Sequence, residues 1–127
     1  MSNAEAVVIV GAGPIGLACA ISAVRRGIDP LVLDAGSIAE SIARYPVGMT
    51  FFTTPDRLEI GNHPLVCSGA KATREEALMY YRGVARVERL RVRPFHRLVS
   101  GRRVGPGFEL EFDRVLRGDR VSVRADR

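Results

Sequence analysis

Three glycines near the start of the chain have the spacing of a loop that binds a dinucleotide. Gly11, Gly13 and Gly16 follow a β-branched run and open a helical pattern. In such a loop the first glycine allows a tight turn, the second lets a pyrophosphate approach the backbone, and the third lets the helix pack close to the strand. The first turn of the helix offers unpaired N–H groups and a partial positive charge to phosphates.

An acidic residue stands where a ribose would lie. Asp34 ends the second apolar run, and its carboxylate can accept hydrogen bonds from ribose hydroxyls. The same carboxylate would repel a 2′-phosphate, which favours FAD or NAD over NADP at this loop. The neighbouring candidates for cofactor binding are Pro14, Ile15 and Ala35.

A strand–helix–strand unit must position these groups. Residues 6–10 predict a parallel strand buried on both faces, residues 14–26 a helix, and residues 30–33 a second strand. Proline suits a first helical turn, and Gly27 supplies a left-handed stop.

The rest of the chain predicts a second helix and a meander. Residues 36–64 are rich in Pro and Gly and indicate a long loop, in which Phe51 and Phe52 are expected to be core residues. The capping-box pair Thr73 and Glu76 begins a helix over 73–90. The apolar stripe expected on that helix comprises Ala77, Tyr81, Val84, Val87 and Leu90.

A short strand at 91–95 and an antiparallel meander of three strands then follow. The predicted fold is α/β: a Rossmann-like FAD/NAD(P)-binding domain with a parallel sheet, helices and a meander. The meander favours FAD over NAD, because a nicotinamide-binding domain usually continues with further βα units.

Composition narrows the class of protein. The net charge is +5, but the arginines that cause it alternate with acidic residues in the predicted meander, which indicates a solvated face and no nucleic-acid partner. No apolar run reaches the roughly 20 residues of a membrane span, so we expect a cytoplasmic protein without a membrane partner.

Residues 1–4 resemble a remnant of cloning. We expect no metal site, an inert buried Cys19 and a more exposed Cys67.

Four further strings carry a family resemblance. Residues 41–46, 50–54, 58–61 and 77–82 resemble the bacillithiol disulfide reductase family, thioredoxin-reductase-like FAD proteins that use NADPH. The resemblance implies FAD on the glycine loop and Asp34. It also implies that the 41–50 loop lies near the flavin ring, with Ser41, Tyr45, Pro46 and Thr50 as candidates for that wall.

The chain departs from the family in two ways. Members that reduce bacillithiol disulfide resemble one another in having a cysteine in the glycine motif, where this chain has Ile15, which cannot form a thiolate. The strand and the A-T-G-like turn expected to lead into the family's NADPH-binding domain do not appear before Arg127, so we interpret residues 5–127 as the FAD-binding part of a truncated protein, with a naturally short protein as the alternative. No catalytic residue is identified, and His63 is only a distant candidate.

The leading hypothesis is therefore the FAD-binding portion of an NAD(P)H-dependent flavoprotein oxidoreductase, inactive by itself. In the intact protein, electrons would pass from NADPH through FAD to a low-molecular-weight disulfide or another acceptor. The alternatives are a fragment of a flavin monooxygenase-like enzyme and a non-catalytic module for nucleotide binding or association. A missing strand would leave an apolar sheet edge open, so we expect a homo-oligomer.

Overall fold

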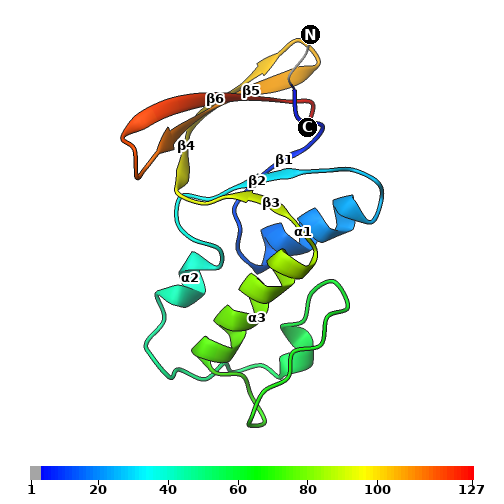
Figure 1. Cartoon of the computed structure of the whole chain (residues 1–127), viewed down its shortest axis with the longest axis vertical. Coiled ribbons are helices and arrows are strands. Elements are labelled where there is room, and N and C mark those ends of the chain that lie inside the picture. The colour runs from blue at the N-terminus through cyan, green and yellow to red at the C-terminus, as the bar shows by residue number, and fades with distance from the viewer. Residues whose placement is uncertain (1–3) are drawn as a thin grey trace.

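The structure is a computed structural model that describes residues 4–127, so most of the predicted cloning remnant, residues 1–3, lies outside it. Figure 1 shows three layers: a β-meander, a parallel sheet beneath it, and helices on the far side of that sheet. The elements in chain order are β1 (Val8–Val10), α1 (Pro14–Val24), β2 (Leu31–Leu33), α2 (Glu40–Ala43), a 3-10 helix (Pro55–Arg57), α3 (Arg74–Val87), β3 (Arg91–Arg93), β4 (His96–Val104), β5 (Gly107–Arg114) and β6 (Asp119–Ala125).

The predicted strand–helix–strand unit is present. β1, β2 and β3 form a parallel sheet in that order, with Val8 opposite Leu31 and Leu31 opposite Arg91. The first strand is shorter than expected, and the prediction that it is buried on both faces is wrong. β1 is an edge strand, and Val10 in it is 51% exposed. Edge strands have one neighbour instead of two, which leaves part of their surface in solvent.

Two hydrophobic cores lie on the two faces of the central strand β2. Leu31 and Leu33 point toward the meander, where they pack on Phe112 and Val123. Val32 points to the opposite face and joins the core beneath the helices. This alternation follows the two-residue period of a strand. β2 is therefore buried on both sides and holds the three layers together.

The meander is antiparallel with the order β4-β5-β6, as predicted. Phe112 is fully buried against the parallel sheet, whereas Phe108 near the hairpin is 37% exposed. The arginines of the opposite face pair with acids, for example Arg102 with Glu109 at 2.8 Å. Such exposed pairs stabilise a fold only slightly. The arginines in these pairs belong to the basic residues that the sequence places in this half of the chain.

The helix α3 begins with the predicted capping box. The Thr73 hydroxyl accepts a hydrogen bond from the Glu76 N–H at 3.1 Å, and the Glu76 carboxylate accepts one from the Thr73 N–H at 3.0 Å. The predicted stripe is correct for its first three members but wrong at Val87, which is 67% exposed. The buried face continues through Ala85 instead, because a helix turns about 100° per residue.

We expect the replacement of Thr73 by alanine to lower the free energy of unfolding by about 1 kcal/mol, because a helix N–H loses its acceptor. Thr54 is a matched control, since it precedes the 3-10 helix without a side-chain capping bond. Urea unfolding of Thr73→Ala and Thr54→Ala checks this prediction. Equal destabilisation of the two variants would contradict it.

The segment 36–64 is less irregular than predicted. It contains the short helix α2 and the 3-10 helix, and Phe52 is 89% exposed, contrary to its expected core position. Phe51 does pack at the edge of the core beneath the helices. Within residues 4–127, no helix combines the length and the apolar character that crossing a membrane requires.

Candidate functional site

The glycine loop joins β1 to α1 in a very tight turn. Gly11 has a φ of +114°, a region that side-chain-bearing residues rarely adopt. A Cβ atom at Gly16 would lie 1.9 Å from the carbonyl oxygen of Gly11. The third glycine is therefore required by the close contact between the helix and the end of the strand, as the sequence predicts.

The start of α1 is left open toward solvent. Gly13 is its N-cap residue and supplies no side-chain cap, and Pro14 follows as the first helical residue. The N–H groups of a first helical turn have no intrahelical acceptors, and they carry the positive end of the helix dipole. A Cβ atom added to Gly13 would meet nothing within 4 Å. The loop thus offers backbone donors and free space at the same place.

Asp34 connects the glycine loop to both sheets. One carboxylate oxygen accepts a hydrogen bond from the Ala12 N–H at 2.7 Å, and the other accepts one from the Gly36 N–H at 2.8 Å. The backbone of Asp34 donates to the Arg93 carbonyl and accepts from the His96 N–H, at 3.2 and 2.7 Å. A carboxylate has about four acceptor positions, so two bonds leave capacity for ribose hydroxyls.

We expect Asp34→Asn to lower the free energy of unfolding by about 2 kcal/mol even without a ligand. The amide group would place an N–H donor against one of the two backbone N–H groups, so that one bond is lost. Asp56→Asn is the control, because the Asp56 carboxylate is exposed and has no hydrogen-bond partner within residues 4–127. Urea unfolding that gives equal stabilities for the two variants would contradict the prediction.

A cavity of about 410 Å³ opens beside the glycine loop. We call it the α1–α2 cavity. α1 forms one wall, α2 forms another, and the segment after the 3-10 helix closes it. Its lining residues are Pro14, Ile15, Ala18, Ser41, Ile42, Tyr45, Phe51, Arg57, Leu58, Glu59, Ile60 and Tyr81.

Most predicted site residues meet at this cavity or at the glycine loop. Ser41 and Tyr45 line the cavity together with residues of the loop, and the Tyr45 ring lies 5.9 Å from that of Phe51. Pro46 and Thr50 are not among its lining residues. Pro46 lies in an exposed turn, and Thr50 forms an isolated antiparallel bridge with Thr73. Ala35 follows Asp34 after the end of β2 and is exposed.

The sequence interpretation missed several lining residues. Leu58 and Ile60 belong to a string already used for the family resemblance, so that string was the available signal. Ile42 is buried on the short helix α2, which no capping residue announces. Tyr81 was expected to be only a core residue, and it both packs in the core and reaches the cavity.

The prediction for Cys19 is wrong, because the residue is exposed. Leu17, Ala20 and Ile21 form the buried face of α1, and Cys19 lies about 200° around the helix from Leu17. Ile15 shares that outer face and is 85% exposed. Cys67 is half-buried, less exposed than expected.

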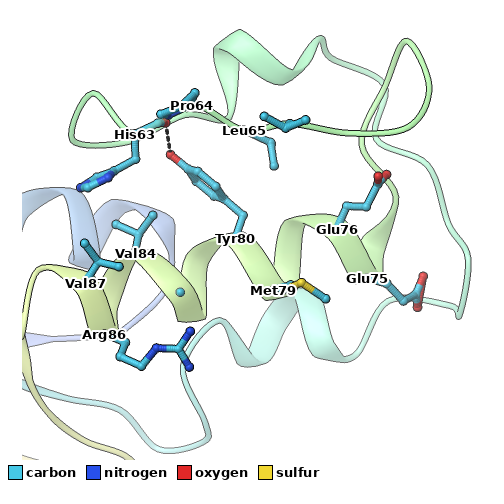
Figure 2. Close-up of a pocket in the computed structure, with 12 residues that line it drawn as sticks. His63, Pro64, Leu65, Glu75, Glu76, Met79, Tyr80, Val84, Arg86 and Val87 are labelled. Carbon is cyan, nitrogen blue, oxygen red and sulfur yellow. Dashed lines mark hydrogen bonds between the residues drawn. The ribbon is translucent and has the colours of Figure 1, made fainter.

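A second hollow lies along α3, and Figure 2 shows it between this helix and the 63–66 segment. This α3 groove has a volume of about 500 Å³ and is mostly apolar, with Val66, Met79 and Val87 exposed along it. It shares no lining residue with the α1–α2 cavity, and none of the predicted cofactor-binding residues lines it. The distant catalytic candidate His63 does line the groove, and its ring is bonded to the Glu88 carboxylate at 2.8 Å. The chemistry predicted from the sequence therefore belongs to the α1–α2 cavity.

A parallel sheet, a glycine loop that opens a helix, and a meander over the sheet together define a dinucleotide-binding domain of the α/β class. The chain belongs to the pyridine nucleotide-disulphide oxidoreductase family, whose model matches residues 8–115.

Individual relatives agree with this assignment. Bacilliredoxin reductase Bdr of Bacillus subtilis is 42% identical over 82 residues, which are 65% of this chain and 25% of that protein. The structure of bacillithiol disulfide reductase Bdr from Bacillus cereus superposes with a TM-score of 0.94 at 38% identity, over 98% of this chain and 38% of that one. A flavin monooxygenase from Stenotrophomonas maltophilia shares the fold, with a TM-score of 0.87 at 20% identity over 98% of this chain and 37% of that one.

These comparisons confirm the predicted fold class and the resemblance to the bacillithiol disulfide reductases. The chain spans about a quarter of the curated relative and under two fifths of the solved ones.

Proposed function

We propose that the chain is the FAD-binding portion of an NAD(P)H-dependent flavoprotein oxidoreductase of the disulfide-reductase type. The observation that carries the proposal is the glycine loop, where an uncapped helix start faces free space next to Asp34. The FAD pyrophosphate would lie on the loop and the adenosine ribose at the Asp34 carboxylate. The isoalloxazine ring would extend toward the α1–α2 cavity.

The residues present fit this group. Gly13 leaves open space where a pyrophosphate needs to approach the backbone, and the helix start supplies donors without a competing cap. The cavity walls near Ile15, Ile42 and Phe51 are apolar, as a planar ring system requires.

NADPH is the proposed electron donor of the whole protein, with a low-molecular-weight disulfide or another compound as acceptor. When bound, the flavin supplies hydride and electron chemistry that side chains lack.

Ile15 limits the route of the electrons. Its side chain is exposed at the cavity mouth and has no sulfur, so no thiolate at this position attacks a disulfide. We therefore propose that the acceptor takes its two electrons without a mixed disulfide at residue 15. The monooxygenase alternative has the fold in common but a lower identity, 20% against 38%, so the disulfide-reductase type has the stronger support.

The test is the identity of the bound cofactor. The chain is purified, its visible spectrum is recorded, and any cofactor is released by heat and identified by chromatography. We expect a yellow protein that releases FAD and takes up added FAD. A colourless protein that binds neither FAD nor an adenine dinucleotide would refute the proposal. Preferential uptake of NADP would contradict the proposed role of Asp34.

We also propose that the chain self-associates through the outer edge of β1. β1 is one of the two edge strands of the parallel sheet. Its Val8 N–H donates to the Arg127 carbonyl at 2.9 Å, so the part of this edge proposed for association is the end at Val10, which is 51% exposed. Apolar strand edges pair readily with other chains. Light scattering at micromolar concentration is expected to give a mass above that of one chain, and a monomer would overturn this proposal.

A further inference from the structure

Three consecutive side chains of α3 bind the two loop segments that flank the α1–α2 cavity. Tyr80 and Tyr81 bond to backbone atoms of residues 58–63, whereas Arg82 bonds to residues 37–38. We call these residues the tyrosine–arginine triplet. They lie in a string that carries the family resemblance, and the glycine loop does not account for them.

The two tyrosines hold the segment after the 3-10 helix. The buried Tyr81 donates its hydroxyl hydrogen to the Leu58 carbonyl at 2.7 Å. The Tyr80 hydroxyl accepts a hydrogen bond from the Ile60 N–H at 2.8 Å and donates to the His63 carbonyl at 2.6 Å (Figure 2). The tyrosine rings support each other edge to face, with centroids 5.1 Å apart. Leu58 and Ile60 line the cavity, so this wall depends on two phenol groups.

Arg82 holds the segment that leads into α2. Its Nε donates to the Ile38 carbonyl at 3.1 Å, and an Nη donates to the Ser37 hydroxyl at 2.9 Å. The other end of α2 is held from the same helix, because an Nη of Arg74 donates to the Ala43 carbonyl at 2.7 Å. α2 carries cavity residues between these two anchors.

Helix geometry explains how adjacent residues reach different loops. Successive side chains leave a helix about 100° apart, so Tyr81 enters the core while Tyr80 and Arg82 project to either side of it. The segments they hold have only a four-residue helix and one 3-10 turn of their own. Such segments would have to be ordered when a ligand binds unless other contacts fix them first.

We propose that Tyr80, Tyr81 and Arg82 are positioning residues that fix the two walls of the α1–α2 cavity at the spacing the flavin ring requires. This inference rests on the proposed function, since it names the residues that prepare that site. The Tyr81 ring lines the cavity, but both phenol oxygens and two of the three guanidinium nitrogens of Arg82 bond to partners in the walls, so these polar groups act on the site through the walls. The triplet orders the two wall segments before FAD binds, so less conformational entropy is lost on binding.

The test compares Tyr80→Phe, Tyr81→Phe and Arg82→Gln with the control Arg86→Gln. Arg86 is an exposed arginine one turn further along α3 that does not line the α1–α2 cavity, and its guanidinium has no hydrogen-bond partner within the described residues. FAD affinity is measured by flavin fluorescence at a temperature where circular dichroism shows every variant to be folded. We expect each triplet variant to bind FAD roughly threefold to tenfold more weakly, and Arg86→Gln to bind like the parent chain.

Backbone amide exchange without FAD provides a second measurement. We expect the Ile60 amide to exchange faster in Tyr80→Phe, because the hydroxyl that it donates to is gone. Unchanged FAD affinity in all three triplet variants, even with lower thermal stability, would overturn the inference and leave the proposed function intact. Failure of the parent chain to bind FAD would refute the proposed function. In that case the amide exchange still tests the triplet: exchange over residues 58–63 that is the same in Tyr80→Phe as in the parent chain would refute its positioning role.

Discussion

Replacement of Gly16 by alanine is expected to lower the free energy of unfolding by about 3 kcal/mol or more. The added methyl carbon would lie 1.9 Å from the Gly11 carbonyl oxygen and 2.9 Å from the carbonyl carbon. Both atoms belong to the backbone of a turn whose φ of +114° leaves little freedom to move. The helix would have to withdraw from the strand and open the core beneath it. Urea unfolding without cofactor measures the loss.

Gly13→Ala is the matched control within the same loop. Gly13 has an ordinary φ of −81°, and a methyl group there would meet no atom within 4 Å. We expect a loss of at most about 1 kcal/mol of stability, because alanine is a poorer N-cap residue than glycine. FAD affinity should nevertheless fall about tenfold or more, since the methyl group enters the space proposed for the pyrophosphate. If both variants lose stability equally, steric contact with Gly11 is not the reason for the third glycine.

The second large effect concerns alkaline pH. Burial raises the pKa of Tyr81 to about 12, because the core cluster around its ring consists of hydrophobic residues that cannot stabilise a phenolate. In the unfolded chain a tyrosine has a pKa of about 10. Between these values the unfolded state has lost the proton that the folded state keeps. The free energy of unfolding therefore falls by about 1.4 kcal/mol per pH unit from pH 10 to pH 12, and this contribution is fully present below pH 10.

Tyr81→Phe removes the group and should reduce the number of protons released on unfolding at about pH 11 by about one. Burial also raises the pKa of Tyr80, so a smaller pH dependence remains in this variant. Tyr45→Phe is the control, because Tyr45 is 37% exposed and lies outside the buried core. Urea unfolding at several pH values gives the slopes. The same slope in Tyr81→Phe as in the parent chain would contradict the assignment of the proton to Tyr81.

The sequence predicted best where the structure is determined locally. The β1–α1–β2 unit follows from an apolar run, a glycine loop and an acidic strand end, and the capping box of α3 follows from Thr73 and Glu76 alone. The helix α2 could not be predicted in this way. Its N-cap residue, Ala39, has a φ of +59° and no capping side chain, and its ends are held by arginines of α3 that are distant in sequence.

The two errors within helices have a different origin. Cys19 was assigned to the sheet-facing side by its spacing from Gly16, and Val87 to a five-residue apolar stripe, yet both are exposed. A helical face is defined by all its members, and at about 100° per residue an error of one position moves a side chain from core to surface. The cavity residues were partly missed because the walls come from three segments that only the tertiary structure brings together.

Asp34 gives the molecule a property that neither sheet has alone. Its side chain bonds to the glycine loop, while its backbone bonds to β3 and to the first residue of β4. The parallel sheet and the meander share no strand, yet separating them breaks the bond between the Asp34 carbonyl and β4 and opens the core that Leu31 and Leu33 form with Phe112. We therefore expect the two sheets to melt as one cooperative unit, with a single transition in calorimetry. A dinucleotide bound at the loop would then raise the melting temperature of the meander, which it does not touch.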